Sequence, residues 1–276
     1  MDHALFSAVR DRQAILFVGA GVSMNLGLPS WDELVTEMGR RLKYDSEVFE
    51  GLGIKTELAQ FYEIRKRSFD TLRKWMNRKW HTSHKRVDRS RVHRAIVNLQ
   101  FPIIYTTNFD RWLEIAYERR NKRFTKVSNV SDFARIRDGV TQIIKFHGDL
   151  DDVSPLVLTE TDYFDRLVFE SPLDIKLRSD SIGKTILFIG YGMSDINLRY
   201  LLYKLERMWT LSRFADERPR SFIFLTRPNS VQETILQQRG IQPIVSKKDD
   251  PADGLTTFLE GLVKAVSMSK TTSRRN

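Results

Sequence analysis

The sequence has 276 residues, of which 41% are hydrophobic and 29% charged, a composition typical of one large globular domain or two small ones. No apolar run approaches the roughly 20 residues that span a membrane, and the N-terminus lacks the features of a signal peptide, so we expect a cytoplasmic protein. The lack of cysteine excludes disulfides and thiolate zinc sites, and the net charge of +10 favours polyanionic partners.

The first predicted strand leads directly into a glycine turn. Ile15-Leu16-Phe17-Val18 is fully apolar, as is typical of a strand buried on both faces of a parallel sheet. Gly19-Ala20-Gly21 follows, and Ser23 is placed to cap the next helix. A strand, a glycine turn and a helix start together direct free N–H groups toward a phosphate. An ordinary strand-to-helix turn has the same pattern, and Met24 occupies the third glycine position of the dehydrogenase fingerprint.

A helical segment separates this strand from the next one. After an amphipathic helix at 31–42, residues 44–98 keep a helical pattern, which predicts an insertion between the first two strands. Residues 63–94 hold twelve Lys or Arg and three acidic residues, an excess of nine positive charges (12 − 3). Trp75 and Trp80 lie among them, a pattern that fits nucleic-acid contact or protein-interface anchors. It also fits a solvated helical face with both tryptophans in the core.

Strands and helices then alternate to the end of the chain. Helices are expected near 111–120, 171–181, 196–209 and 255–266, and the further strands at 101–105, 142–146, 186–189, 221–225 and 241–245. This alternation predicts an α/β, doubly wound, mainly parallel, Rossmann-like sheet. We expect a single domain over residues 1–268, followed by a frayed basic tail at 269–276.

Small or polar residues follow four of these strands. The segments are Gly19-Ala20-Gly21, Thr107-Asn108-Phe109-Asp110, His147-Gly148 and Gly190-Tyr191-Gly192. The carboxyl ends of parallel strands lie along one edge, where α/β proteins place ligands. Imidazole can accept a proton near neutral pH, and a carboxamide can fix a ribose hydroxyl or a water. Each residue alone is more often a cap or a core hydrogen bond, but their joint occurrence at strand ends favours a site.

These four motifs, with Gly27-Leu28-Pro29 after the first, resemble the ordered motifs of the sirtuin superfamily over residues 14–195. Their form resembles the bacterial sirtuin-like domains of antiphage defence systems, which hydrolyse NAD. The resemblance implies that Asn108 and Asp110 hold the nicotinamide ribose and the attacking water, and that His147 is the general base. The NAD-binding residues that it implies are Gly19, Ala20, Gly21, Ser23, Thr107, Gly190, Ser194 and Asp195.

Two departures from the protein-deacylating sirtuins bear on the reaction. Those enzymes carry a four-cysteine zinc ribbon and a glutamine before the asparagine, whereas this chain has no cysteine and has Thr107 at that position. The resemblance therefore implies an NAD+ glycohydrolase that releases nicotinamide and ADP-ribose, with NAD+ as substrate and no metal. Three alternatives stay open: a non-catalytic NAD or ADP-ribose sensor, a deacylase without zinc, and a nucleic-acid-binding module that uses the basic insertion.

The resemblance also implies control by other molecules, because an unrestrained NAD+ hydrolase would kill its host. Similar proteins are paired with HerA-type ATPases or Argonaute-like proteins. We therefore expect an effector of abortive infection that forms a homo-oligomer and has a separate partner protein of one of these types. Nucleic acid is a further possible partner, through the basic insertion.

Overall fold

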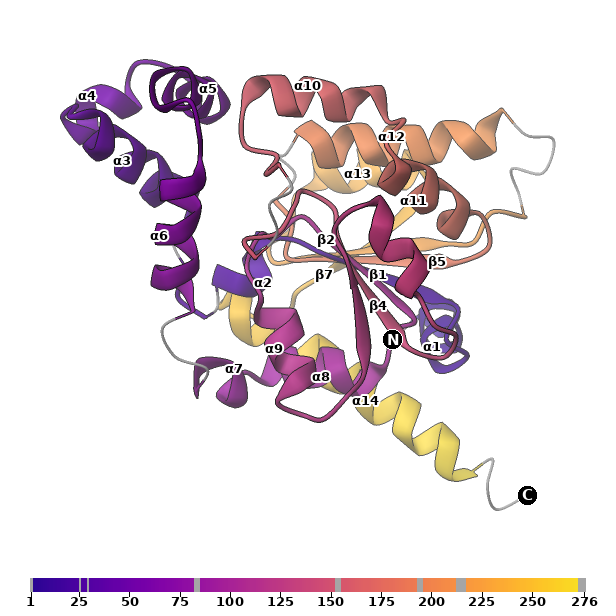
Figure 1. Ribbon diagram of the computed structural model, residues 1–276. Helices are drawn as coiled ribbons and strands as arrows, with labels where there is room; N and C mark the ends of the chain where they lie inside the picture. The colour runs from indigo at the N-terminus through magenta and orange to yellow at the C-terminus, as the bar shows by residue number, and fades with distance from the viewer. Residues whose placement is uncertain are drawn as a thin grey trace.

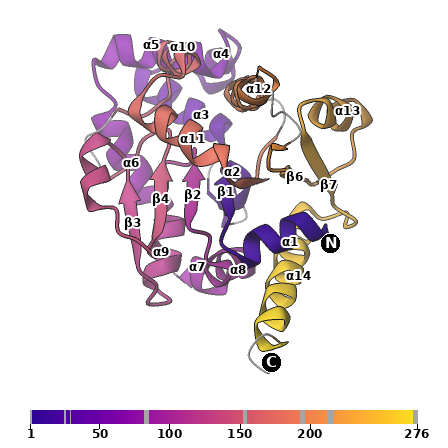
Figure 2. The same ribbon diagram turned by 90° about the vertical axis from the view of Figure 1, so that its right-hand side faces the viewer.

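One parallel sheet forms the centre of the computed structural model, which describes residues 2–24, 26–28, 30–81, 85–151, 155–192, 196–211 and 217–272 (Figure 1). Within these residues the strands are β1 (Ala14–Val18), β2 (Ile103–Thr106), β3 (Phe124–Val127), β4 (Thr141–Lys145), β5 (Thr185–Ile189), β6 (Ser221–Leu225) and β7 (Ile241–Val245). Their order across the sheet is β3-β4-β2-β1-β5-β6-β7. Figure 2 labels β3, β4, β2, β1, β6 and β7 in this order from left to right. β1 is central, with Leu16 in register with Ile104 of β2 and Leu187 of β5. The predicted parallel α/β fold is confirmed.

Helices cover both faces of the sheet, which is why the central strands are apolar throughout. Leu16 and Val18 face a core that includes side chains of α1 (His3–Arg10), α8 (Arg91–Leu99), α9 (Trp112–Glu118) and α14 (Pro251–Thr272). Ile15 and Phe17 face a second core, with α11 (Pro172–Ile182), α12 (Ile196–Thr210) and α13 (Ser230–Gln238). Figure 1 shows α8, α9 and α14 below the sheet and α11, α12 and α13 above it.

The insertion between β1 and β2 is helical, as predicted, and stands to one side of the sheet (Figure 1). After α2 (Ala20–Met24) come α3 (Trp31–Leu42), α4 (Ser46–Glu50), α5 (Lys55–Lys66), α6 (Asp70–Trp80) and α7 (Lys85–Arg89). Its own apolar core contains Met38, Tyr62, Met76 and Trp80. The suggestion that Trp80 anchors an interface is therefore wrong, because this side chain is 7% exposed and packs inside the insertion. Trp75 packs at the edge of the core and stays partly exposed.

Two elements beyond those expected contribute to the sheet edge and the site. β3 is an edge strand of mostly half-buried residues, Phe-Thr-Lys-Val, so it lacks the continuous apolar run that marks the central strands. α10 (Glu160–Val168) follows β4 and contacts α5 and α12. The last helix, expected to end at Val266, continues to Thr272, and residues 273–276 lie outside the described chain. Among the described helices, none is both long enough and apolar enough to cross a membrane.

Candidate active site

A cavity of about 360 Å³ lies at the carboxyl edge of β1, β2, β4 and β5. It brings together most of the residues that the sequence placed in a site: Ala20, Ser23, Thr107, Asn108, Asp110, His147 and Gly190. Gly19 lies directly after β1 and Gly21 lies in α2, both beside the cavity, and Ser194 and Asp195 fall outside the described residues. Residues from four strand ends thus converge on one space, as the parallel topology requires.

The glycine turn after β1 packs tightly against the end of β5. The Gly19 N–H donates to the Ile189 carbonyl and the Gly21 N–H to the Gly190 carbonyl, each at 2.9 Å. A Cβ on Gly19 would lie 2.5 Å from the Gly190 oxygen, so only glycine fits there. Both amides are thus engaged within the protein, and of Gly19, Ala20 and Gly21 it is Ala20, the first residue of α2, that lines the cavity. Direct contact of Gly19 and Gly21 with a pyrophosphate stays a prediction.

Ser23 does not cap a helix, contrary to the prediction. α2 begins at Ala20, so Ser23 lies within that helix, where it is 5% exposed. Its hydroxyl oxygen instead accepts a hydrogen bond from the side chain of Asn108 at 2.9 Å. The serine therefore supports the residue that follows β2, rather than the start of its own helix.

Asn108 is held in one orientation by its surroundings. Its Nδ2 donates to the Gly19 carbonyl at 3.1 Å and to Ser23 Oγ at 2.9 Å, an arrangement that fixes which end of the amide is nitrogen. Its backbone N–H donates to Thr106 Oγ1 at 3.1 Å, and Thr106 in turn donates to the Val18 carbonyl. Among the described residues Oδ1 receives no hydrogen bond. It is therefore the side-chain atom left to accept one from a ribose hydroxyl or a water.

His147 lies directly after β4 and is 5% exposed. Its ring stacks on Phe146 and meets the ring of Tyr163 edge-on, with centroids 6.1 Å apart. Burial, together with the nearby guanidinium of Arg166, lowers its pKa to about 3. The imidazole is therefore neutral at physiological pH, where it can accept a hydrogen bond and adds no positive charge to the cavity.

Asp110 combines a structural contact with a place in the cavity. Its Oδ1 accepts a hydrogen bond from the Trp112 N–H at 3.0 Å, at the start of α9. The side chain is 5% exposed, and Lys145 donates to its backbone carbonyl. The carboxylate is thus locked in place next to Asn108, as a group that orients a neighbouring polar atom must be.

Five aromatic residues that the sequence analysis did not assign to the site also line the cavity: Trp31, Trp80, Phe109, Tyr163 and Tyr191. Tyr191 donates from its hydroxyl to the Val18 carbonyl and is 3.0 Å from Thr107 Oγ1. Trp31 comes from the first turn of α3, and Tyr163 from α10. The capping box formed by Thr159 and Asp162 marks the start of α10 and would have revealed that helix from the sequence.

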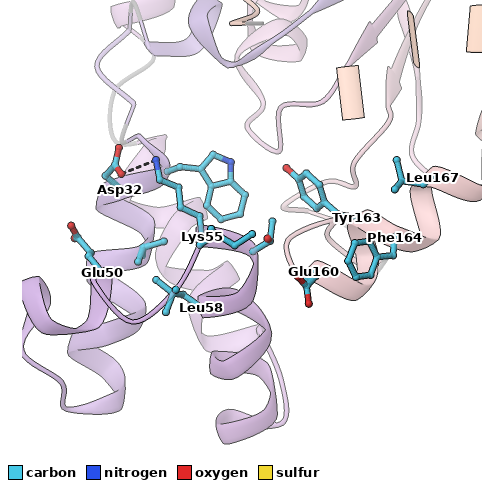
Figure 3. A pocket seen from close by; sticks show the side chains of 13 residues that line it. Asp32, Glu50, Lys55, Leu58, Glu160, Tyr163, Phe164 and Leu167 are labelled. Atoms are coloured by element: carbon cyan, nitrogen blue, oxygen red, sulfur yellow. Dashed lines mark ion pairs between the residues drawn. The ribbon is translucent and has the colours of Figure 1, made fainter. Parts of the chain in front are cut away.

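A larger groove of about 720 Å³ adjoins the cavity, between α3 and α5 on one side and α10 on the other (Figure 3). The two spaces share Trp31, Asp32, Lys55 and Tyr163. Lys55 and Asp32 form an ion pair of 2.7 Å at this junction (Figure 3). The groove contains none of the strand-end residues, so we place the chemistry in the smaller cavity. Helices of the insertion and α10 line the larger groove that opens into this cavity.

Within the described part of the chain, no group of three or more His, Asp or Glu side chains is arranged to hold a metal ion. His84, which the sequence places three residues after His81, lies outside the described residues. His81 Nε2 accepts a hydrogen bond from the Arg111 N–H at 2.9 Å, a structural role beside Asp110.

Comparison with known proteins identifies the family. A family model described as a SIR2-like domain matches residues 102–244, more than half of the chain. This chain belongs to the SIR2-like family. The predicted resemblance to sirtuins is confirmed, and the matched region contains Asn108, Asp110, His147 and Gly190.

Among its relatives, this SIR2-like chain is 31% identical over 227 residues to the NAD(+) hydrolase ThsA of Bacillus cereus (strain MSX-D12), covering 76% of this chain and 45% of that protein. It is 28% identical to the ThsA of Enterococcus faecium, covering 96% and 55%. It is also 28% identical to defense-associated sirtuin 2 of Bacillus subtilis, covering 85% and 23%. The chain thus spans about half the length of the two ThsA relatives, and a smaller share of defense-associated sirtuin 2.

A solved structure of a Sir2 homologue mutant in complex with 2′-O-acetyl ADP ribose has the same fold. The TM-score is 0.50 at 13% sequence identity, with 98% of each chain covered. This likeness concerns the fold alone, and it agrees with the parallel α/β fold described above.

Proposed function

We propose that this chain is an NAD+ glycohydrolase, which cleaves NAD+ to nicotinamide and ADP-ribose as the effector of an antiphage, abortive-infection defence system. The observation that carries the proposal is the convergence of Asn108, Asp110 and His147 on one cavity beside the turn after β1. The names of the relatives in Bacillus cereus and Enterococcus faecium, both NAD(+) hydrolases, support the same reaction.

In this proposal the pyrophosphate of NAD+ lies against the turn after β1, with the nicotinamide ribose toward Asn108 and Asp110. Ala20 and Ser23 line the part of the cavity proposed for the pyrophosphate, together with Thr107 and Gly190. The resemblance assigns the adenosine end to Gly190, Ser194 and Asp195, of which the last two lie outside the described residues. The hydrogen bond from the Gly21 N–H to the Gly190 carbonyl supports the placement of Gly190, because it joins the end of β5 to the segment that follows β1.

The reaction breaks the bond between ribose C1′ and the nicotinamide nitrogen, whose electron pair leaves with the nicotinamide. Positive charge then develops on the ribose as an oxocarbenium-like state, and a water oxygen adds to C1′. Asn108 Oδ1 and the Asp110 carboxylate are acceptors that can orient this water, which is catalysis by positioning. His147, neutral because of its burial, accepts a hydrogen bond from the water or a ribose hydroxyl without repelling the cation. As the water adds to C1′, its proton passes to the His147 imidazole, the general base that the resemblance implies, and from there to solvent.

The same proposal includes control by assembly. We infer a homo-oligomer and a separate partner of the HerA-type ATPase or Argonaute-like class, which restrain or trigger hydrolysis. The insertion offers apolar side chains that such a contact would bury, since Val48, Leu52, Ile54 and Ile64 are each more than half exposed. Mass photometry of the chain with and without each candidate partner tests this part.

The test of the reaction is a product assay. The chain is incubated with NAD+ and with an acetylated-lysine peptide, with and without candidate partners, and the products are separated by chromatography. The proposal predicts nicotinamide and ADP-ribose in equal amounts, no consumption of the peptide, and activity that survives a strong chelator. NAD+-dependent deacetylation at a comparable rate, or no NAD+ loss under any of these conditions, would contradict it.

A further inference from the structure

A second concave site lies on another face of α3. It encloses about 410 Å³ and is lined by Gly27, Glu33, Thr36, Glu37, Arg40, Ser46, Trp75, Lys79 and Arg86. The α3 residues of this lining follow i, i+3, i+4, i+7 spacing, which is one helix face. Trp31, Asp32 and Leu34, which line the candidate active site, lie off that face. The two cavities therefore lie back to back on one helix, and none of the residues assigned to NAD+ chemistry is in the second.

The charge of this site comes from the basic insertion. Lys79 of α6 and Arg86 of α7 form no ion pair with a carboxylate among the described residues, and both are exposed. The buried carboxylate of Glu37 is already bound by Arg40 at 2.8 Å and by Arg41 at 2.6 Å. Two cationic groups are thus available for an anion at the rim.

An aromatic side chain completes the site. Trp75 lines the cavity with its indole partly exposed, and the guanidinium of Arg41 lies 6.0 Å from the ring centroid. An indole among cations is the combination that binds a nucleobase and its phosphate together. The lining also holds carboxylate and hydroxyl oxygens, from Glu33 and Ser46, that suit the hydroxyl groups of a sugar.

We propose that this cavity binds a nucleoside phosphate, with the base against Trp75 and the phosphate between Lys79 and Arg86. Its size is within the range of small-molecule sites, which begin at roughly 300 Å³. The ligand is either a free nucleotide or one nucleotide of a single strand, since both present the same chemistry to these three side chains.

Besides α3, a hydrogen bond from Arg86 connects this site to the segment before α3 that lines the candidate active site. Arg86 Nη1 donates to the Leu26 carbonyl at 3.1 Å, in the short segment between α2 and α3. Leu28 of the same segment lines the candidate active site. A phosphate that draws Arg86 toward itself therefore acts on this segment. If the proposed NAD+ hydrolysis holds, the bound nucleotide changes its rate, and this coupling is the part that rests on the proposed function.

Calorimetric titration with two probes, ATP and an oligothymidylate, tests the site without measuring hydrolysis. The test variant is Lys79→Glu/Arg86→Glu, and the matched control is Lys74→Glu/Arg78→Glu. The control residues are exposed on α6, the helix of Lys79, lie outside the cavity lining, and carry the same charge change. A third variant, Trp75→Leu, removes the stacking surface. Thermal melts check that each variant is folded.

We expect the wild type to bind at least one probe, and Lys79→Glu/Arg86→Glu to weaken that binding by about tenfold or more, as loss of two phosphate contacts should. The control should weaken ATP binding by less than about twofold. The probe that binds distinguishes a free nucleotide from a strand. Binding of neither probe, or an equal loss in test and control variants, would overturn the proposal. Because the readout is binding, failure of the proposed hydrolysis would leave this result intact.

Discussion

Asn108, which follows β2, donates a hydrogen bond from Nδ2 to Oγ of Ser23 in α2 at 2.9 Å. The two residues are 85 positions apart in the sequence, and the whole helical insertion lies between them. This bond and the one from Nδ2 to the Gly19 carbonyl tie the ends of β1 and β2 together. The carboxamide is therefore oriented before any substrate enters, which is the pre-organisation that positional catalysis requires.

Ser23→Ala should lower NAD+ turnover by about tenfold while the affinity for NAD+ changes less. The change removes one of two acceptors for Asn108 Nδ2, so the amide is held less firmly, by the remaining hydrogen bond to the Gly19 carbonyl. The comparison is kcat and KM of the variant with those of Ser181→Ala, a similarly buried serine whose hydroxyl donates to the Arg178 carbonyl in α11. Equal turnover for both variants and the wild type would show that Ser23 does not position Asn108.

Gly190→Ala should destabilise the protein by roughly 1–3 kcal/mol and lower its activity. Gly190 has a φ of +72°, and a Cβ there would lie 2.8 Å from the Val22 nitrogen, so the turn after β5 would move away from α2. Gly183→Ala is the control, because a Cβ at that position meets nothing within 4 Å. Urea denaturation of both variants measures the difference. A urea denaturation curve of Gly190→Ala that matches that of the wild type would contradict the tight packing between the end of β5 and α2.

The pH profile of NAD+ hydrolysis should have no step near the ordinary histidine pKa of 6.5. The reaction as proposed needs neutral His147, and burial lowers its pKa to about 3. Protonation would therefore begin to reduce activity only at much lower pH, so kcat should stay flat from about pH 8 down to about pH 5. Initial rates across this range are the measurement. A fall in kcat centred near pH 6.5, abolished by changing His147, would contradict this assignment.

A second buried histidine should make the protein acid-sensitive. His93 in α8 is 1% exposed, and burial lowers its pKa to about 4, so the unfolded chain takes up a proton at mildly acidic pH that the folded chain does not. Its contribution to stability is complete above pH 6.5 and is lost as the pH falls toward 4, with about 2 kcal/mol gone near pH 5. The free energy of unfolding of His93→Gln should therefore fall less between about pH 7 and about pH 5 than that of the wild type. Parallel losses in the two proteins would contradict this.

The central strands and the residues after them could be predicted from sequence because local pattern determines both. A strand such as Ile15 to Val18 is apolar throughout since helices cover each face, and polar residues such as Asn108 and His147 follow at once. Parallel pairing then brings those strand ends to one edge of the sheet, independently of the conformation of the loops. β3 was not predicted from this pattern, because an edge strand needs no continuous apolar run.

Contacts between distant segments could not be read in this way. The hydroxyl of Ser23 looked like a helix cap, and only the approach of β2 to α2 shows that it serves Asn108. Trp75 and Trp80 have similar basic neighbours in the sequence. Trp80 nevertheless packs in the core of the insertion, whereas Trp75 lines a basic cavity. That cavity exists because α3, α6 and α7 meet in space, which no local periodicity reports.

The most direct test of the central claim is NAD+ turnover by His147→Ala and Asn108→Ala, with His93→Ala as the control. Both target residues are buried, at 5% and 8% exposure, so each variant is first shown to be folded by circular dichroism and a thermal melt. His93 is an equally buried histidine outside the cavity. In an assay where the wild type hydrolyses NAD+, we predict a fall of at least about a hundredfold for His147→Ala and Asn108→Ala, and near-normal turnover for folded His93→Ala. Near-wild-type turnover by folded His147→Ala would contradict the account.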